Sequence, residues 1–530
     1  MYLYVLTNMS SQISREVISQ GSLNLTRSVP ARRVLTLTLA LVLCAVYAGA
    51  AVGACPPGFD DAPALPTHIN QADIVDGKMS FGEIFRAGQR IFTTDFNRCD
   101  GAGRPGSTGS GAARTADPLT GPRFTRLSAP DSSSCASCHN EPQPGGAGDF
   151  VSNVFVLAQN ENPVATTLLD LNFAQTFLER NTLGMFGSGS IGLLGREMTH
   201  DLLGIQSKAI AQAKETGQDV TAQLVTKGVP FGQIVAHADG SVDTGGVQGV
   251  DTDLIVKPFS RKGATRSVRE FTVNAFNQHH GMQAVERFGE GTDPDQDGVA
   301  DEMTIGDVTA VSIFHESLPI PVQQMPRDPK QAEIVGHGQK MFAKAGCASC
   351  HIPALTVGST NFCEPDPMNP TSGAFKTFAD TSQSYCFDLR KTSGMRGDVV
   401  NAYTDLKRHV ICDDNKPEFC NEPPALLQLT DTGKPCPFNE YLTAKLWDVG
   451  NSTPYGHRGD VDTIYQAIID HGGEAATSEA NYEALPDSDQ KAIVAFLKTL
   501  KMPIIAGDPE PMAAGSPRAD REGDHLRLEH

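Results

Sequence analysis

Two short motifs carry the most specific chemistry in this sequence. Residues 135–139 and 347–351 both read Cys-Ala-Ser-Cys-His, which is the spacing typical of c-type haem attachment. Two thiols three positions apart can each add to one haem vinyl group, and the next residue then offers an imidazole to the iron. A structural zinc site or a redox-active cysteine pair is the alternative interpretation. We predict two covalent haem c groups attached at Cys135, Cys138, Cys347 and Cys350, with His139 and His351 as iron ligands.

The second axial position of each iron decides what each haem can do. A strong second ligand makes a low-spin electron carrier, whereas an open position lets a small molecule reach the iron. Spacing alone leaves several candidates. After the first motif they are Met185, Met198, His200, His279 and His280, and after the second they are His409, His457 and His471. His279 and His280 are adjacent on a predicted helix and point about 100° apart, so they cannot easily share one iron.

An acidic run at residues 293–302 predicts a third site. Its alternating aspartates, with Gly298 at the turn, resemble the start of a calcium-binding loop. The twelfth loop position holds Thr304 instead of the usual glutamate, although Asp301 or Glu302 could substitute. The alternative is a solvated acidic turn. We expect calcium to bind at Asp293, Asp295, Asp297 and Asp301, where it would brace the loops between domains.

Helical patterning precedes each motif. Apolar residues recur at helical spacing between Phe81 and Phe92, and again between Ile334 and Phe342. Further helices are predicted over 203–226 and 267–285, and a terminal helix should begin at Asp487 or Ser488 after a proline. A loop rich in glycine, serine, proline and arginine, at 98–131, separates the first helix from its motif.

The chain is too long for one compact core, so two domains with tails are expected from its 530 residues. Few segments show strand patterning. We predict a mainly α protein with two cytochrome c-like domains and long irregular loops. The first would span 55–325 and the second 326–507, joined by a linker with four prolines at 319–329, and a disordered tail would follow at 508–530.

The N-terminal segment predicts export. Arginines precede an apolar run at 34–47, and small residues follow it, which is the pattern of a cleaved signal peptide over 1–54. The run is too short to favour a permanent membrane helix. Cleavage could follow Ala50 or Ala54. Residues 52–55 also resemble a lipoprotein box, in which Cys55 would carry a lipid anchor; the alternative is a disulfide between Cys55 and Cys99.

Cysteine usage agrees with a periplasmic or secreted location. Of twelve cysteines, one lies in the signal and four lie in the two motifs, and five of the rest crowd into 363–436. Such clustering favours disulfide-stapled loops in an oxidising compartment. The net charge of −19 argues against nucleic acid as a partner, because an acidic surface repels phosphate. A basic redox partner, such as a small cytochrome or a cupredoxin, is permitted.

With these motifs in view, residues 78–505 resemble the bacterial di-haem c-type oxidoreductases, also called thiol oxidoreductases. These are distantly similar to bacterial di-haem cytochrome c peroxidases. Besides the two haem motifs, the resemblance rests on four blocks. They read Tyr-Thr-Asp-Leu at 403–406, Leu-Trp-Asp-Val-Gly at 446–450, Tyr-Gly-His-Arg-Gly at 455–459 and Ala-Ile-Ile-Asp-His-Gly-Gly-Glu-Ala at 467–475.

The resemblance implies roles for particular residues. His471 should reach the second iron, so that the second haem transfers electrons and the first is reactive. In the peroxidases a distal glutamate moves a proton during peroxide cleavage. Here a strict match puts Arg269 at that position, with Glu270 one residue later. Arg269 could stabilise negative charge on a bound oxygen; the alternatives are a surface position or pairing with a haem propionate.

The tryptophan pattern also departs from that of the relatives. Trp447 is the only tryptophan in the chain and lies in the second half, so the relatives' bridging tryptophan has no counterpart at its expected place. Three functions follow from the sequence. The first is a peroxidase-like oxidoreductase, the second is a pure electron-transfer cytochrome, and the third is a haem-based oxygenase.

Overall fold

The computed structural model describes residues 62–103, 132–155, 177–293, 298–366, 384–416, 419 and 439–504. The predicted signal peptide over 1–54, Cys55 and the tail at 508–530 lie outside these residues, so those predictions remain as they stand. Within the described ranges, no helix combines the length and apolar character needed to cross a bilayer.

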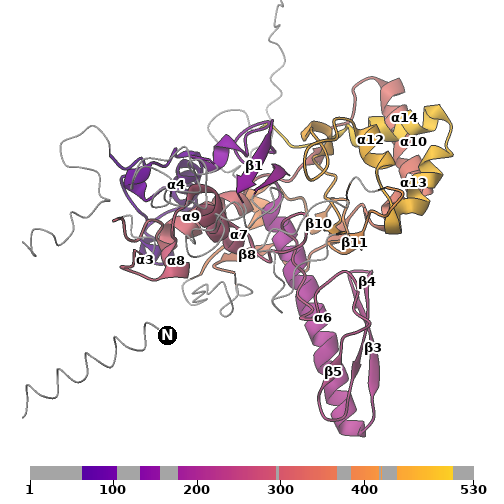
Figure 1. The fold of residues 1–530 in the computed structure, drawn as a ribbon, viewed down its shortest axis with the longest axis horizontal. Helices are drawn as coiled ribbons and strands as arrows, with labels where there is room; N and C mark the ends of the chain where they lie inside the picture. Colours follow the sequence, from indigo (N-terminus) through magenta and orange to yellow (C-terminus); the bar gives the residue numbers. More distant parts are fainter. Residues whose placement is uncertain are drawn as a thin grey trace, which may run out of the picture. The chain divides into compact units, whose positions relative to one another are not determined.

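Helices form most of the framework around the two motifs (Figure 1). They are α3 (Gln71–Val75), α4 (Phe81–Thr93), α6 (Ser188–Thr216), α7 (Val268–Ala275), α8 (Val285–Phe288), α9 (Ile305–Glu316), α10 (Pro329–Lys344), α11 (Leu389–Thr392), α12 (Ile464–Ile469), α13 (Ala476–Glu483) and α14 (Asp487–Leu497). The helices predicted before each motif, and the terminal helix from Asp487, are confirmed.

The first helix pair joins α4 to α9. Their contact is close because Gly88 has no side chain: a Cβ there would lie 2.0 Å from the carbonyl oxygen of Ala310. One turn further along, the rings of Phe92 and Phe314 pack with centroids 5.1 Å apart. Capping boxes begin both helices, at Ser80 and at Thr304, and so fix where each one starts.

The second pair, α10 with α14, repeats this arrangement. A Cβ on Gly338 would lie 1.9 Å from the carbonyl oxygen of Ala492. The rings of Phe342 and Phe496 again pack one turn away, with centroids 5.6 Å apart. Each pair therefore has a glycine and a phenylalanine four residues apart on one helix, facing an alanine and a phenylalanine four residues apart on the other.

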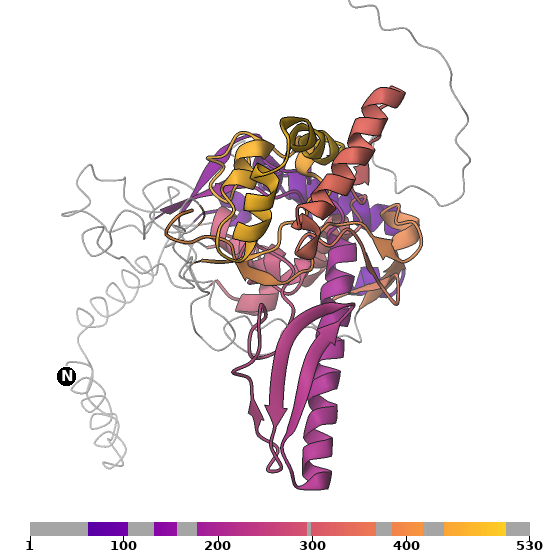
Figure 2. The same ribbon diagram turned by 90° about the vertical axis from the view of Figure 1, so that its right-hand side faces the viewer.

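Helix α6 packs along a three-stranded antiparallel sheet, and Figure 2 shows the two side by side. The sheet consists of β3 (Val220–Thr226), β4 (Val229–Ala236) and β5 (Val242–Asp243). The predicted helix over 203–226 is thus wrong at both ends, because α6 begins at Ser188 and ends at Thr216. Gly217 adopts a left-handed conformation that caps α6, and the following residues turn back as a strand. Over 267–285, α7 ends early and a π-helical turn, η4 (Phe276–His280), follows.

The other sheets described are two-stranded. Their strands are β1 (Val151–Phe155) with β2 (Phe177–Asn181), β6 (Val322–Gln323) with β13 (Leu500–Lys501), β7 (Leu355–Thr356) with β10 (Val399–Val400), β8 (Asn361–Glu364) with β9 (Tyr385–Asp388), and β11 (Arg408–Val410) with β12 (Glu440–Leu442). The predicted linker at 319–329 contains β6, which pairs with the end of the second half and so holds the linker in place.

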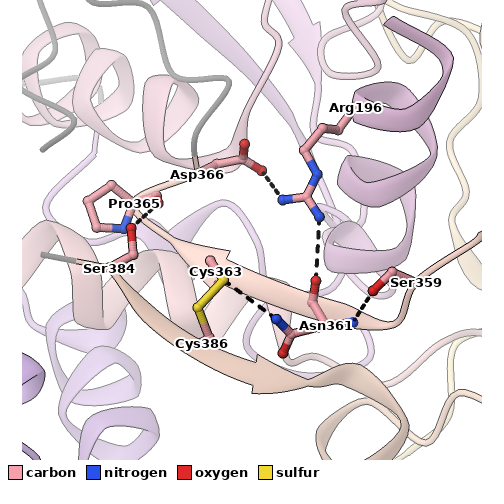
Figure 3. The surroundings of a disulfide bond; sticks show 8 residues. All are labelled: Arg196, Ser359, Asn361, Cys363, Pro365, Asp366, Ser384 and Cys386. Atoms are coloured by element: carbon pink, nitrogen blue, oxygen red, sulfur yellow. Dashed lines mark hydrogen bonds and ion pairs between the residues drawn. A yellow bond between two sulfur atoms is a disulfide. The ribbon is translucent and has the colours of Figure 1, made fainter. Parts of the chain in front are cut away.

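A disulfide between Cys363 and Cys386 joins β8 to β9 (Figure 3). Arg196 of α6 reaches the same hairpin, where Nη1 lies 3.3 Å from Oδ2 of Asp366. Cys99 and Cys412 are also in disulfides, with partners beyond the described residues. The free cysteines among those described are the four of the two motifs, as the predicted division between stapling and haem-binding cysteines requires.

Candidate haem sites

The two motifs fold alike. Each forms a short 3₁₀ turn, η2 (Cys135–Ser137) and η5 (Cys347–Ser349). In each, the backbone N–H of the histidine donates to the carbonyl of the first cysteine at 3.0 Å. This turn brings both thiols and the imidazole to one side of the chain, as attachment to a single haem requires.

The first motif histidine is held by a backbone carbonyl. Nδ1 of His139 donates to the carbonyl oxygen of Leu183 at 3.0 Å, and the ring of Phe92 lies beside it at 6.2 Å between centroids. A carbonyl can only accept, so Nδ1 carries the proton and the Nε2 lone pair is left for a metal. Burial lowers the pKa of His139 to about 4, which keeps the imidazole neutral at pH 7.

The second motif histidine has the same orientation. Nδ1 of His351 lies 3.1 Å from each of two carbonyl oxygens, those of Tyr403 and Ala444, and Phe342 packs beside the ring at 6.4 Å. Burial lowers its pKa to about 4 as well. The Tyr-Thr-Asp-Leu block therefore has a local structural role. Tyr403 supplies one carbonyl, and Thr404 anchors the loop by donating to Thr443 at 2.8 Å.

His471 faces His351 directly. Their ring centroids are 6.5 Å apart, and the ring planes are inclined at 65°. Nδ1 of His471 donates to the carbonyl oxygen of Ala467 at 2.7 Å, which leaves its Nε2 lone pair available too. Imidazole–metal bonds are about 2.0 Å long, so two rings on opposite sides of one ion have centroids about 6 Å apart. The spacing fits a metal held between these two histidines.

The other two histidine candidates after the second motif line the same cavity but have different contacts. Both ring nitrogens of His409 are engaged, with Asp405 and with Glu474, each at 2.8 Å. Although burial opposes protonation, these carboxylates raise the pKa of His409 to about 11, so its nitrogens are both donors. His457 stacks on the ring of Tyr441 at 5.0 Å.

A cavity of about 290 Å³ joins these groups. Its lining includes both thiols of the second motif, His351 and His471. Apolar side chains of Phe342, Ile468 and Leu497 also line it, together with a few charged groups. Haem c attachment uses two thiols, one adjacent imidazole and an apolar enclosure, and all of these are present here with His471 as a second imidazole, so the residues fit the cofactor.

At the first motif, a histidine lies beside one of the cysteines. His280, at the end of the π-helical turn η4, is 2% exposed, and its Nε2 lies 3.4 Å from Sγ of Cys135. Its Nδ1 donates to the carbonyl oxygen of Ser132 at 2.8 Å. His279 influences the pKa of His139, after burial as the larger cause. A π-helical insertion is a common way to bring side chains to a functional site.

The three remaining candidates for the first iron lie in different parts of the structure. Met185 packs in the cluster that contains Cys135 and Ala136, so it borders the first motif. Met198 is fully buried in the core between α6 and its neighbours. His200 is exposed on α6. Of these three, the structure brings only Met185 to the motif.

Arg269 is neither at the surface nor beside a motif residue in any described contact. Its side chain is 0% exposed, with ion pairs to Glu286 at 2.7 Å and to Glu364 at 2.8 Å. The predicted surface alternative is therefore wrong for Arg269. Glu270 is also buried, and its Oε2 accepts from the backbone N–H of Arg266 at 3.0 Å. Their catalytic roles remain predictions, while these contacts give both residues a structural one.

The calcium prediction falls partly outside the described residues, because Asp295 and Asp297 are not among them. Asp293 accepts from the N–H of Gly298 at 3.0 Å, and Asp301 accepts from that of Gly291 at 2.7 Å. Thr304 caps α9. Glu302 points inward, where its Oε2 accepts from the N–H of Gln283 at 2.6 Å. Calcium binding stays a prediction.

Sequence reasoning missed the residues that orient the two motif histidines. Leu183 acts through its backbone carbonyl, which leaves no signal in the sequence. Phe92 and Phe342 could have been identified from the sequence, because each follows a glycine by four residues and precedes a motif.

Trp447 is 1% exposed, and its ring closely covers Gly187 at the start of α6.

Comparison with known proteins gives a partial match. No protein-family model matches the chain. Over 183 residues the chain is 30% identical to the cytochrome-c peroxidase IdrP2 of Pseudomonas sp. strain SCT, a match covering 33% of this chain and 41% of that protein. A structure of Kuenenia stuttgartiensis hydrazine synthase under xenon aligns with 91% of this chain and 100% of its own, at 14% identity and a TM-score of 0.34. The chain is thus similar, over part of its length, to a cytochrome-c peroxidase.

Proposed function

We propose that this chain is an exported di-haem c-type oxidoreductase in which the first haem reacts with peroxide or another small oxidant and the second supplies electrons. The observation that carries the proposal is the contrast between the two sites. His471 faces His351 with an available nitrogen, whereas the described residues give His139 no histidine ring in the equivalent facing contact. The partial similarity to a cytochrome-c peroxidase agrees with this class of reaction.

The repeated helix pairs support two cytochrome c-like domains. In each, a phenylalanine ring packs beside the motif histidine and a carbonyl fixes its Nδ1 proton. Such a hydrogen bond increases the electron donation of an imidazole to its metal. When bound, each haem would supply one-electron redox chemistry. The chain's own contribution is to hold His139 and His351 neutral and oriented, and to close the second site with His471.

A pure electron-transfer cytochrome is the second candidate. It is favoured by the position of His280 beside Cys135, because a nearby histidine could close the first site as well. Both candidates use the same attachment chemistry. They differ only in whether the sixth coordination position of the first haem iron is open or filled.

Spin state separates the two. The protein is made in a host that attaches haem c, and the haem content and the paramagnetic resonance spectrum are measured on the oxidised form. We expect two haems per chain, one high-spin and one low-spin, and peroxide consumption with a reduced donor. Two low-spin haems and no turnover would favour the electron carrier. A protein without haem would overturn the proposal.

A further inference from the structure

One wall of the second cavity carries cations that no carboxylate contacts. Arg261 and Lys445 line the cavity with His351 and His471. Among the residues that the structure describes, no carboxylate forms an ion pair with either side chain. Nη2 of Arg261 donates to the backbone carbonyl of Asn181 at 2.8 Å, which orients the guanidinium without neutralising it.

The carboxylates on the same lining are mostly occupied elsewhere. Glu474 pairs with His409 at 2.8 Å, and Glu479 pairs with Lys416 at 3.3 Å. Asp448 remains, and burial raises its pKa to about 6. Asp448 attracts both Arg261 and Lys445, so this half-buried wall carries two cations against one carboxylate.

The cations of this wall also contribute to the pKa shifts of neighbouring groups. Burial lowers the pKa of Arg261 to about 10, with Arg180 as the next cause. Burial also lowers the pKa of Lys445; Asp448 opposes this shift and Arg261 adds to it. The pKa of His457, which lines the cavity too, falls to about 2 through burial first and then through the nearby cations. A bound anion would oppose the part of these shifts that comes from the neighbouring cations.

We propose that Arg261 and Lys445 form the binding site for the propionate carboxylates of the second haem. This inference rests on the proposed function, because haem c brings two carboxylates into a cavity whose other lining is largely apolar. A guanidinium matches a carboxylate with a planar pair of N–H donors, and an ammonium acts as a point charge. The thiols, the histidines and these cations would then hold three different parts of one cofactor.

The test measures the midpoint potential of the low-spin haem and its dependence on pH, by spectroelectrochemistry of the full-length haem-loaded protein. Arg261→Gln and Lys445→Gln should keep both covalent haems, since the thioether bonds are untouched. Losing a cation beside the propionates disfavours the reduced haem. At a fixed potential, the ratio of reduced to oxidised haem should therefore fall about tenfold, which corresponds to a midpoint potential lower by about 59 mV for one electron. The potential should also gain a dependence on pH, because a less stabilised propionate takes up a proton more readily.

Two further variants separate charge from structure. Arg261→Lys keeps the charge and should restore most of the potential. Lys491→Gln makes the same change of net charge on the exposed face of α14, where water screens it, and should leave the potential unchanged.

Three outcomes would overturn the inference. In the first, both glutamine variants keep their haem and the wild-type potential and pH profile, which would leave the proposed function standing. In the second, inorganic phosphate at constant ionic strength shifts the wild-type potential but not that of Lys445→Gln, so the wall binds a soluble anion instead. In the third, the wild-type protein carries no haem, which would remove both proposals.

Discussion

The helix pairs α4–α9 and α10–α14 share their contacts but differ in what surrounds them. Ile84 and Ile334 occupy matching positions four residues before the contact glycine, yet Ile84 is 0% exposed and Ile334 is 41% exposed. Glu316 and Lys498 likewise each follow the second phenylalanine by two residues, and Glu316 is fully buried whereas Lys498 is exposed. The shared contacts orient the motif histidine, and the surroundings make the two halves chemically different.

The burial of α9 places polar groups where water cannot reach them. Its residues from Gly306 to Glu316 are buried, including His315 and Glu316. Helix α14 instead keeps an ordinary exposed face. The first half therefore buries polar and titratable side chains on α9, whereas the second half does not do so on α14.

The largest expected effect tests whether the two motifs are equivalent in haem attachment. Replacing Cys347 and Cys350 together with serine should reduce the covalent haem content from two to one per chain, because both thioether bonds of one site are lost. The matched variant replaces Cys135 and Cys138. Haem content is measured by the pyridine haemochrome method and mass spectrometry. Retention of two covalent haems in either variant would contradict the assignment.

The next prediction concerns the difference between the two haem irons in their sixth ligand. His471→Ala should convert the second haem to high spin without loss of covalent haem, because Cys347, Cys350 and His351 remain. Paramagnetic resonance of the oxidised protein measures the change. His337→Gln is the control, because His337 is exposed, pairs with Asp489 and does not line the cavity, so its loss should not alter the spin state. An unchanged spectrum for His471→Ala would eliminate it as ligand.

The helix contacts themselves should respond alike in the two halves. Gly88→Ala and Gly338→Ala each force a Cβ against a carbonyl of the facing helix, and each should lower the free energy of unfolding by about 1–3 kcal/mol. Gly336→Ala, on the same helix as Gly338 but with nothing within 4 Å, is the control and should be neutral or stabilising by about 1 kcal/mol. Urea unfolding followed by circular dichroism measures all three. A tolerated Gly88→Ala would show that the helix pairs are not equivalent.

The smallest expected effect concerns the buried carboxyl groups of the first half. Burial raises the pKa of Glu364 to about 7 and that of Glu316 well above its ordinary value, with each carboxyl influencing the other. Because the folded state holds these protons more tightly than the unfolded chain, this contribution to stability is present below about pH 4.5 and is lost as the pH rises through about 7.

Glu316→Gln removes one of the two titrating groups. It should reduce the loss of unfolding free energy between pH 5 and pH 8, by an amount on the order of 1 kcal/mol. Denaturant unfolding at several pH values measures the difference. Glu483→Gln, on the exposed face of α13, is the control and should leave the profile unchanged. A wild-type profile without any decline toward pH 8 would contradict the prediction.

The parts of the fold with strong local patterns could be predicted from the sequence. The helices before the motifs and the helix from Asp487 have apolar periodicity and clear starts, and the structure has them there. The end of α6 was misplaced because the helical pattern was extended past Gly217 into a segment, 220–226, that alternates like a strand. That glycine was the available stop signal.

The two sites were predictable to different depths. The attachment residues follow from spacing alone, whereas the candidacy of His471 over His409 and His457 came only from the family resemblance. Facing contacts between residues 120 positions apart depend on tertiary packing, which local patterns do not encode. The ion pairs of Arg269 were equally out of reach, because Glu286 and Glu364 come from distant segments.

The carbonyl of Leu183 connects the two sites mechanically. It accepts the Nδ1 proton of His139, and the same residue lines the second cavity with its neighbours Asn181, Thr182 and Gly184. Any reshaping of that cavity that displaces this segment lengthens or shortens one hydrogen bond at the first motif. Under the proposed function, occupancy of the second cavity would in this way alter the electron donation of His139 to its iron.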